Sequence, residues 1–355
     1  MRNGLRHSLV PVLAALATAG GLPAQTMVHA PGGTLNGVVR DSATGLPIGY
    51  ALVQVVGNEQ RVFASESGRF TLMALGSGGL ILRVQQIGFR AVTLALTLDR
   101  STESGGGAPG LEVRLARRPM VLPEIVVHGD VCAGTEALGT SAVEESILDE
   151  AFKNAERILA MEKSYPFRGT FEETLLLLDN AHRETSRHVN TIRFDTRDLA
   201  GYRRGRVLLG RRDRGQVANY FVASDLARTE FRKSHCFWYA GPDSSVDGFP
   251  GHRIEFAPLA RIKTTDWAGS FVIDSATMIL IRSEAHLVNL KQKETMFTAA
   301  QCVVLYREIV PTLALEAQAD CTTSGSSAAA PNTLARWKLV NFTFVGRSPV
   351  KPDST

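Results

Sequence analysis

The sequence predicts a mainly β protein, in which an all-β domain precedes an α+β domain with one long helix packed on an antiparallel sheet. Three observations support this prediction. Short runs rich in Val, Leu, Ile and Thr alternate with turn residues from position 35 to position 118. One long amphipathic pattern occupies residues 141–163, and strand patterns dominate again after Pro166. The content of 44% hydrophobic and 21% charged residues is typical of globular domains.

Residues 1–25 have the pattern of a secretory signal peptide. Arg2 and Arg6 precede an apolar run at residues 9–16, and residues 17–19 and 22–24 are candidate cleavage sites. The apolar run is too short to span a bilayer. We therefore expect an exported protein of the periplasm, the outer-membrane surface or the extracellular medium, without a transmembrane segment. The net charge of +4 at pH 7 is too small to indicate a nucleic-acid partner.

Strand patterns between residues 33 and 119 define the first predicted domain. Apolar and polar residues alternate in "LNGVVRD", "YALVQVVG", "SGRFTL" and "RAVTLALTL", as they do in half-buried strands. Thr44-Gly45 and Ser67-Gly68 supply turn positions that tolerate a positive φ. This succession of short strands and turns is typical of a sandwich or a barrel. The Gly/Ser-rich stretch 99–110 is predicted to be a loop before the last strand.

The same runs resemble the carboxypeptidase regulatory-like domain. That family combines a Gly-x-Val-x-Asp strand, a Thr-Gly-x-Pro-Ile turn, a Gly-x-Phe turn and a late Gly-Phe. The resemblance implies a seven-stranded, transthyretin-like sandwich that holds no peptidase site and occurs in many exported bacterial proteins. The residues that match the pattern are Gly37, Asp41, Thr44, Gly45, Pro47, Ile48, Gly68, Phe70, Gly88 and Phe89.

Residues 120–140 are predicted to form an extended linker between the two domains. In TonB-dependent receptors that carry this module, a similar acidic-Val-Val-x-Gly stretch follows it, near the peptide that engages TonB. The chain departs from the receptors beyond this stretch, because Cys132 and an amphipathic pattern follow and the chain is too short for a receptor barrel. We therefore interpret the stretch as a connector with a TonB-like sequence. Its matching residues are Glu124, Val126, Val127 and Gly129.

The second predicted domain, residues 141–348, begins with the helix. Apolar residues recur at i, i+3 and i+4 spacing, Ser141 and Glu144 form a capping box, and Pro166 ends the pattern. The apolar stripe predicts that the helix packs on a sheet, and its acidic opposite face argues against a membrane-surface helix. The strands over residues 252–287 loosely resemble those of periplasmic lipoprotein-carrier half-barrels. This resemblance implies a concave apolar face that can carry an acyl chain.

Four cysteines in an exported chain predict two disulfides. Cys302 and Cys321 flank residues 303–320, which have the pattern of a hairpin with a turn at residues 311–312. A two-residue loop at this position places Cys302 opposite Cys321. We predict a disulfide between them, which leaves Cys132–Cys236 as the second pair. A metal site is the alternative, but it would need close pairs such as C-x-x-C, which the sequence lacks.

No motif in the sequence predicts catalysis. His252 and Glu255 have the H-x-x-E spacing of the zinc ligands in metallocarboxypeptidases, with His286 as a candidate third ligand. In a strand, however, residues three apart point to opposite faces. The sequence also lacks a G-x-S-x-G elbow and a phosphate-binding Gly-rich loop. We therefore expect a non-enzymatic protein without a metal or a cofactor, and a zinc carboxypeptidase-like hydrolase is the less favoured alternative.

Two clusters are candidate ligand-binding sites. The hairpin "YRRGRVLLGRRDRG" carries arginines that suit anionic lipid headgroups or an acidic protein. The alternative is a solvated edge hairpin, whose charges prevent aggregation between sheets. The stretch "HCFWYAG" carries rings that suit a sugar or an apolar cleft, or that form core beside a disulfide. The candidate residues are Arg203, Arg204, Arg206, Arg211, Arg212, Arg214, Phe237, Trp238 and Tyr239.

These patterns lead to two hypotheses about function. The first is a non-catalytic binding or adaptor protein of the bacterial cell envelope, with a protein or a carbohydrate ligand. The second is a periplasmic carrier that holds a lipophilic ligand in a half-barrel. Neither hypothesis requires a nucleic-acid partner.

Overall fold

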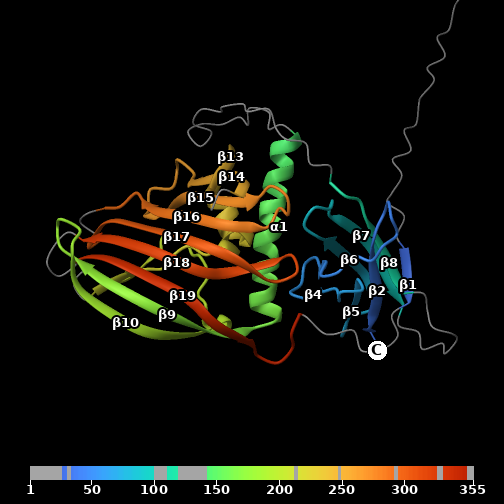
Figure 1. The fold of residues 1–355 in the computed structure, drawn as a ribbon. Coiled ribbons are helices and arrows are strands. Elements are labelled where there is room, and N and C mark those ends of the chain that lie inside the picture. Colours follow the sequence, from blue (N-terminus) through green and yellow to red (C-terminus); the bar gives the residue numbers. More distant parts are fainter. Residues whose placement is uncertain are drawn as a thin grey trace, which may run out of the picture.

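The computed structural model describes residues 26–29, 33–99, 110–118, 142–211, 215–246, 249–291, 295–325 and 331–349. In these residues the protein is mainly β, with small N-terminal sheets followed by one long helix and a large nine-stranded antiparallel sheet (Figure 1). The predicted signal peptide, the predicted linker with Cys132, and Arg212 and Arg214 lie outside the described residues. Neither helix in the described ranges combines the length and the apolar character that a membrane crossing needs.

Two small sheets near the N-terminus share one hydrophobic core. Their strand orders are β1-β7-β6-β3-β4 and β5-β2-β8, and β1–β7 and β2–β8 are parallel pairs. Val39 of one sheet and Leu82 of the other are fully buried members of the same cluster. The strands are β1 Thr26–His29, β2 Leu35–Asp41, β3 Leu52–Val55, β4 Arg61–Phe63, β5 Arg69–Leu72, β6 Gly78–Gln85, β7 Val92–Asp99 and β8 Leu111–Leu115.

Two residues of the family pattern fix turns in these sheets. Asp41 is 1% exposed, and its carboxylate accepts hydrogen bonds from the Ala43 backbone N–H at 2.8 Å and from Arg117 Nε at 2.7 Å. These two partners hold the pKa of Asp41 below its ordinary value. Gly68 has a φ of 75°, and a Cβ there would lie 2.6 Å from the Val39 carbonyl oxygen. Only glycine therefore fits at position 68 without backbone movement.

Helix α1, Ala142–Ser164, stands between the large sheet and the N-terminal sheets (Figure 1). The predicted helix, residues 141–163, agrees with it to within one residue at each end. The apolar stripe is buried in a core shared with the large sheet, as the spacing predicted: Ile147, Ala151 and Ile158 are each at most 6% exposed. Tertiary packing of this stripe provides most of the stability of such a helix.

The charged face of α1 contacts the N-terminal sheets. Glu150 Oε2 accepts a hydrogen bond from the Gly88 backbone N–H at 3.0 Å, and Lys153 Nζ donates to the Phe89 carbonyl oxygen at 2.5 Å. Glu150 and Lys153 are 2% and 1% exposed, and they also pair with each other at 2.8 Å. The late Gly-Phe of the family pattern therefore supplies backbone partners for the helix. The helix is covered on both sides, which its sequence pattern does not show.

Arg157 joins α1 to both parts of the molecule. It is 1% exposed, and it donates hydrogen bonds to the Tyr50 carbonyl oxygen at 2.8 Å and to the Thr312 hydroxyl oxygen at 2.7 Å. Its guanidinium carbon lies 5.0 Å from the centroid of the Phe63 ring. Burial lowers the pKa of Arg157 to about 9, against the opposing attraction of Glu308. This side chain therefore fixes the N-terminal sheets and the β17–β18 turn to one point of the helix.

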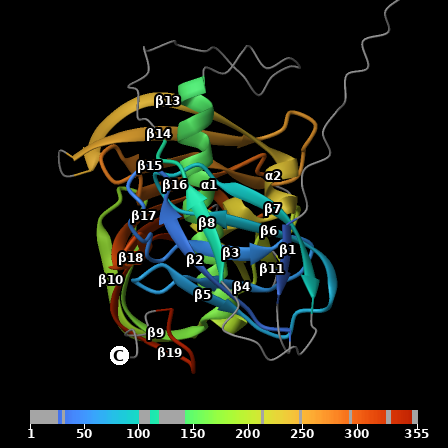
Figure 2. The same cartoon turned by 90° about the vertical axis from the view of Figure 1, so that its right-hand side faces the viewer.

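The nine strands of the large sheet follow the order β10-β9-β19-β18-β17-β16-β15-β14-β13, and every neighbouring pair is antiparallel. The sheet curves around the side that carries α1, from β13 at one edge to β9 and β10 at the other (Figure 2). The strands are β9 Phe167–Leu178, β10 Glu184–Asp195, β13 His235–Val246, β14 Phe249–Pro258, β15 Asp266–Asp274, β16 Leu280–Val288, β17 Phe297–Val310, β18 Leu313–Gly325 and β19 Asn332–Phe344.

Residues 196–234, here called the insertion, connect β10 to β13 across the sheet. They contain η2 Thr196–Asp198, the two-stranded sheet of β11 Leu208–Arg211 and β12 Gly215–Ala218, η3 Ala223–Ala227 and α2 Thr229–Ser234. Tyr202, Phe221 and Phe231 of the insertion belong to the same buried cluster as α1 and the large sheet. The insertion therefore covers part of the face of the sheet that carries α1.

The predicted Cys302–Cys321 disulfide is confirmed. The hairpin turns at residues 311–312 with Val310 opposite Leu313, and Cys302 lies opposite Cys321. Between these two pairs the register shifts twice, at Glu308/Val310 and at Leu305/Tyr306, and the shifts have opposite sign. Each is a one-residue bulge on a different strand, so the two cancel at the cysteines. Cys236 is also disulfide-bonded, but its predicted partner, Cys132, lies outside the described residues.

Candidate ligand cavity

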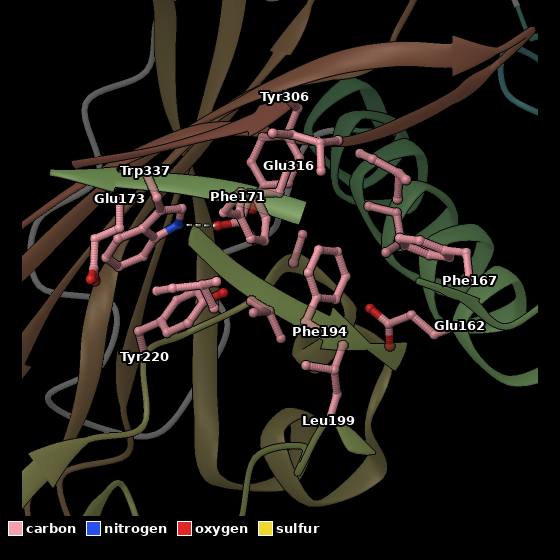
Figure 3. Close-up of a pocket in the computed structure, with 16 residues that line it drawn as sticks. Glu162, Phe167, Phe171, Glu173, Phe194, Leu199, Tyr220, Tyr306, Glu316 and Trp337 are labelled. Carbon is pink, nitrogen blue, oxygen red and sulfur yellow. Dashed lines mark hydrogen bonds between the residues drawn. The ribbon is translucent and has the colours of Figure 1, made fainter. Parts of the chain in front are cut away.

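A cavity of about 360 Å³ lies between α1, the insertion and one half of the large sheet (Figure 3). Its walls come from α1, β9, β10, β17, β18 and β19, together with Leu199, Tyr220, Val222 and Ala223 of the insertion. Most of the 16 lining side chains are aromatic or aliphatic. Protein interiors are packed to crystal-like density, so an unfilled apolar space of this size is a candidate ligand site.

Phenylalanine rings form one end of the cavity. Phe167 and Phe171 are four residues apart on β9, so they point to the same face of the sheet. The Phe194 ring of β10 stacks on Phe171, with centroids 4.8 Å apart, and meets Phe167 edge-on at 5.8 Å. Ile192 and Leu199 also line the cavity and are each 39% exposed, so the cavity opens to solvent beside them.

A second group of rings surrounds Glu316 at the other end (Figure 3). Trp337 Nε1 donates a hydrogen bond to Glu316 Oε1 at 3.1 Å, and the Tyr220 ring lies 5.4 Å from the Trp337 ring. Tyr306 of β17 is the cross-strand neighbour of Glu316, at the bulge that ends at Gln318. A bulge re-aims side chains, and here it brings Glu316 to the cavity beside Tyr306.

The cavity holds two carboxyl groups whose protonation is altered by burial. Burial raises the pKa of Glu162 to about 7, opposed by Ser224 and Arg228. Burial likewise raises the pKa of Glu316 to about 7, opposed by hydrogen bonds from Trp337 and Tyr220. Both groups therefore change charge near neutral pH inside an apolar space.

The predicted arginine cluster lies away from this cavity. Arg203, Arg204 and Arg206 are exposed in the loop before β11, and Arg211 is the last residue of that strand. The predicted hairpin is present as the β11–β12 pair. Arg203, Arg204 and Arg206 do not line the cavity, and Arg212 and Arg214 lie outside the described residues.

The predicted aromatic cluster is divided between the two faces of β13. Phe237 packs edge-on against Phe152 of α1, with centroids 5.1 Å apart, and Tyr239 is 8% exposed with its hydroxyl 3.1 Å from His252 Nδ1. Trp238 lies between them in the strand and points to the opposite face. The three rings therefore do not form a common stacking surface.

His252 and Glu255, the pair with zinc-ligand spacing that the sequence argued against, are also divided between two faces. His252 is 4% exposed on the same face as Ile254, whereas Glu255 accepts a hydrogen bond from Arg253 Nε at 3.2 Å on the other face. The alternation of β14 produces this separation, as the strand pattern predicted. Within the described ranges, no group of three His, Cys, Asp or Glu side chains is placed to hold a metal ion.

A Ser-His-Asp contact chain is present but sealed in the core. Ser234 Oγ lies 3.1 Å from His235 Nδ1, and His235 Nε2 lies 3.6 Å from Asp266 Oδ1. The three residues are at most 3% exposed, His235 Nε2 lies 3.0 Å from the Trp267 carbonyl oxygen, and Tyr202 donates a hydrogen bond to Asp266 at 2.8 Å. Burial lowers the pKa of His235, which keeps the ring neutral. None of the three lines the cavity, so a substrate there cannot reach this serine.

Comparison with known proteins identifies the N-terminal module. Residues 34–107 match the carboxypeptidase regulatory-like domain. The match confirms the resemblance carried by the turn and strand residues of this segment. No curated protein matches the chain.

Two solved structures are similar to larger parts of the chain. One is a DUF1329 family protein from Desulfovibrio piger, with 11% identity and a TM-score of 0.33, over 56% of this chain and 94% of that chain. The other is a candidate membrane-associated protein of unknown function from Bacteroides fragilis, with 10% identity and a TM-score of 0.18, over 90% of this chain and 99% of that chain.

The cavity residues were missed by the sequence analysis, although one signal was present. Glu162 falls in phase with the apolar stripe of α1, three turns after Ala151 and four residues after Ile158. A carboxyl group in an apolar stripe is costly unless it has a role, so this position was a candidate site residue. Glu316 and Trp337 gave no such signal, because only the strand pairing brings them together.

Proposed function

We propose that this protein is an exported, non-catalytic carrier that holds a lipophilic ligand in the cavity of its second domain. The observation that supports the proposal is the cavity itself: about 360 Å³, walled by Phe167, Phe171 and Phe194 and open beside Ile192 and Leu199. Ligand sites have typical volumes of roughly 300–1,000 Å³, mostly apolar walls and a few placed polar groups. Burial of an apolar chain against such walls stabilises the complex by about 25 cal/mol for each Å² removed from water.

In this proposal, the large curved sheet is a half-barrel. Its concave side holds the ligand, and α1 and the insertion cover that side. The N-terminal module is a transthyretin-like sandwich that braces α1 through Gly88, Phe89 and Arg157. Export through the predicted signal peptide would place the carrier in the periplasm or at the outer membrane. A carrier of this kind needs no catalytic group, metal or cofactor.

A cavity-filling variant tests the proposal. Ala223 lines the cavity and is 3% exposed, so Ala223→Leu places three additional carbon atoms in the space that the ligand would occupy. The probe is N-phenyl-1-naphthylamine, a neutral apolar dye whose fluorescence rises in apolar surroundings. We expect saturable binding by the wild-type protein and an affinity at least tenfold lower for Ala223→Leu. The matched control is Ala260→Leu at an exposed turn, which should bind like the wild type.

Equal binding by the wild type and both variants would show that the dye binds elsewhere. Absence of saturable binding by the wild type would contradict the carrier function. A cooperative thermal unfolding transition of Ala223→Leu would show that the variant is folded.

A second function is favoured by the exposure of Arg203, Arg204 and Arg206. Three exposed cations in one short loop suit an adaptor that contacts an anionic membrane surface or an acidic envelope protein. Under this proposal, Arg203→Glu combined with Arg204→Glu abolishes co-sedimentation with vesicles that contain phosphatidylglycerol. Equal co-sedimentation of the wild type and the double variant would contradict binding of this loop to an anionic membrane.

A further inference from the structure

The charges around the cavity are all of one sign. Glu162, Glu173 and Glu316 line it, and none of the described residues that line it is basic. An anionic ligand would therefore find repulsion and no compensating cation, and burying an unpaired charge is costly. A ligand that brings its own positive charge would remove this cost.

We infer that the ligand of this cavity is an alkyl ammonium, an apolar chain that carries one cationic nitrogen and no anionic group. The inference rests on the proposed carrier function and specifies its ligand class. The alkyl chain lies along Phe167, Phe171 and Phe194, and the nitrogen lies at the end of the cavity formed by Glu316 and Trp337.

The rings around Glu316 are those that bind ammonium groups. The faces of Trp and Tyr rings attract cations, and several such rings around one site form the aromatic cages that recognise quaternary ammonium ligands. Tyr220, Tyr306 and Trp337 all line this end of the cavity, and the Tyr220 and Trp337 rings are tilted by 60° to each other. The Trp337 N–H points at Glu316 Oε1, so it orients the carboxylate and leaves the ring faces free of that bond.

Glu162 adds a second carboxylate that faces the cavity. It is 8% exposed, and Figure 3 shows its carboxylate directed toward the side chains of Phe194 and Leu199. Ser224 lowers the pKa of Glu162, and its Oγ has no other hydrogen-bond partner among the described groups. A cation bound in the cavity would offset the charge of this carboxylate.

The other charged groups near Glu162 do not neutralise it. Arg228 lowers the pKa of Glu162, but its guanidinium is already paired with Asp225 at 2.9 Å. Asp225 acts in the opposite direction, and Lys163 contributes less than either of them. Glu316 has only neutral neighbours that lower its pKa, Trp337 and Tyr220. Among the described residues, neither carboxylate therefore has a cation that pairs with it alone.

Displacement of bound N-phenyl-1-naphthylamine by four amphiphiles with the same dodecyl chain tests the inference at pH 8. The competitors are dodecyltrimethylammonium, dodecylphosphocholine, dodecanol and dodecanoate, each below the concentration at which it forms micelles. We expect dodecyltrimethylammonium to bind about tenfold more tightly than dodecanol, and dodecanoate to bind most weakly. Dodecylphosphocholine distinguishes a phospholipid headgroup from a plain ammonium, and we expect its phosphate to weaken binding.

Two carboxamide variants locate the cation. Glu316→Gln should lower the affinity for dodecyltrimethylammonium about tenfold and leave the affinity for dodecanol within twofold, which also shows that the variant cavity is intact. Glu162→Gln should lower it less, because the Tyr and Trp rings of the cavity gather around Glu316. Glu145→Gln, at an exposed position of α1, is the matched control and should change neither affinity.

The outcomes separate this inference from the carrier function. Equal affinity for dodecanol and dodecyltrimethylammonium, unaltered in Glu316→Gln, would overturn the inference and leave the carrier function standing. Tighter binding of dodecylphosphocholine or dodecanoate than of dodecyltrimethylammonium would overturn the exclusion of an anionic group. Failure of the dye and of every competitor to bind would contradict both proposals.

Discussion

Glu162→Gln should change the pH dependence of stability. The carboxyl has a pKa of about 7 in the folded protein against an ordinary value of 4.5. Below pH 4.5 the folded and unfolded chains both hold the proton. Between pH 4.5 and 7 only the folded chain holds it, so the free energy of unfolding falls as the pH rises. The total loss is about 3 kcal/mol by pH 8, because each pH unit corresponds to about 1.4 kcal/mol.

Glutamine does not ionise, so the free energy of unfolding of the variant does not fall in this way as the pH rises. Urea unfolding at pH 4.5, 6, 7 and 8 should show the variant gaining about 3 kcal/mol over the wild type across the series. A constant offset between the two proteins does not affect this slope. Exposed Glu145→Gln on the same helix is the control and should give a flat difference. Parallel curves for Glu162→Gln and the wild type would refute the claim that burial holds this carboxyl neutral.

Three further predictions concern the packing around the cavity. Arg157→Met removes the hydrogen bonds that Arg157 donates to the Tyr50 and Thr312 carbonyl oxygens and should lower the free energy of unfolding by about 3 kcal/mol in urea. An unchanged urea midpoint would contradict the claim that Arg157 links the two parts of the molecule. Replacing Cys302 and Cys321 by Ala opens a loop with a sequence separation of 19, and thermal unfolding should show a free energy of unfolding that is about 3 kcal/mol lower. A decrease below about 1 kcal/mol would contradict the claim that closing this loop stabilises the protein. Phe171→Ala should lower the free energy of unfolding by about 3 kcal/mol, which is the low end for such a truncation because one side of the ring already borders the cavity. A decrease below about 1 kcal/mol would show that the ring is not packed as described.

Local patterns predicted much of the fold. Period-two alternation and turn residues identified the strands of the N-terminal module, and the i, i+3, i+4 spacing located α1. The Cys302–Cys321 pairing was correct for a partly fortuitous reason. The prediction assumed a regular hairpin, and the two bulges that the hairpin contains shift the register in opposite directions and cancel. Bulges depend on contacts with the rest of the sheet, so a hairpin pattern alone does not reveal them.

Long-range packing determined what the sequence did not predict. The charged face of α1 has the composition of a solvated face, yet Glu150 and Lys153 are buried against Gly88 and Phe89, because the N-terminal module covers them. The cavity combines six elements of the second domain with the insertion, and its residues are spread from position 158 to position 339. Neither the spacing nor the composition of any one segment indicates that these side chains meet.

Native mass spectrometry tests the carrier function most directly. The full chain would be purified from the periplasm of a Gram-negative host without detergent, beside Ala223→Leu and Ala260→Leu. The carrier function predicts an additional non-covalent mass on the wild type and on Ala260→Leu, which is lost on organic extraction and absent from Ala223→Leu. An apo mass for all three proteins, together with no saturable uptake of the apolar dye, would contradict it.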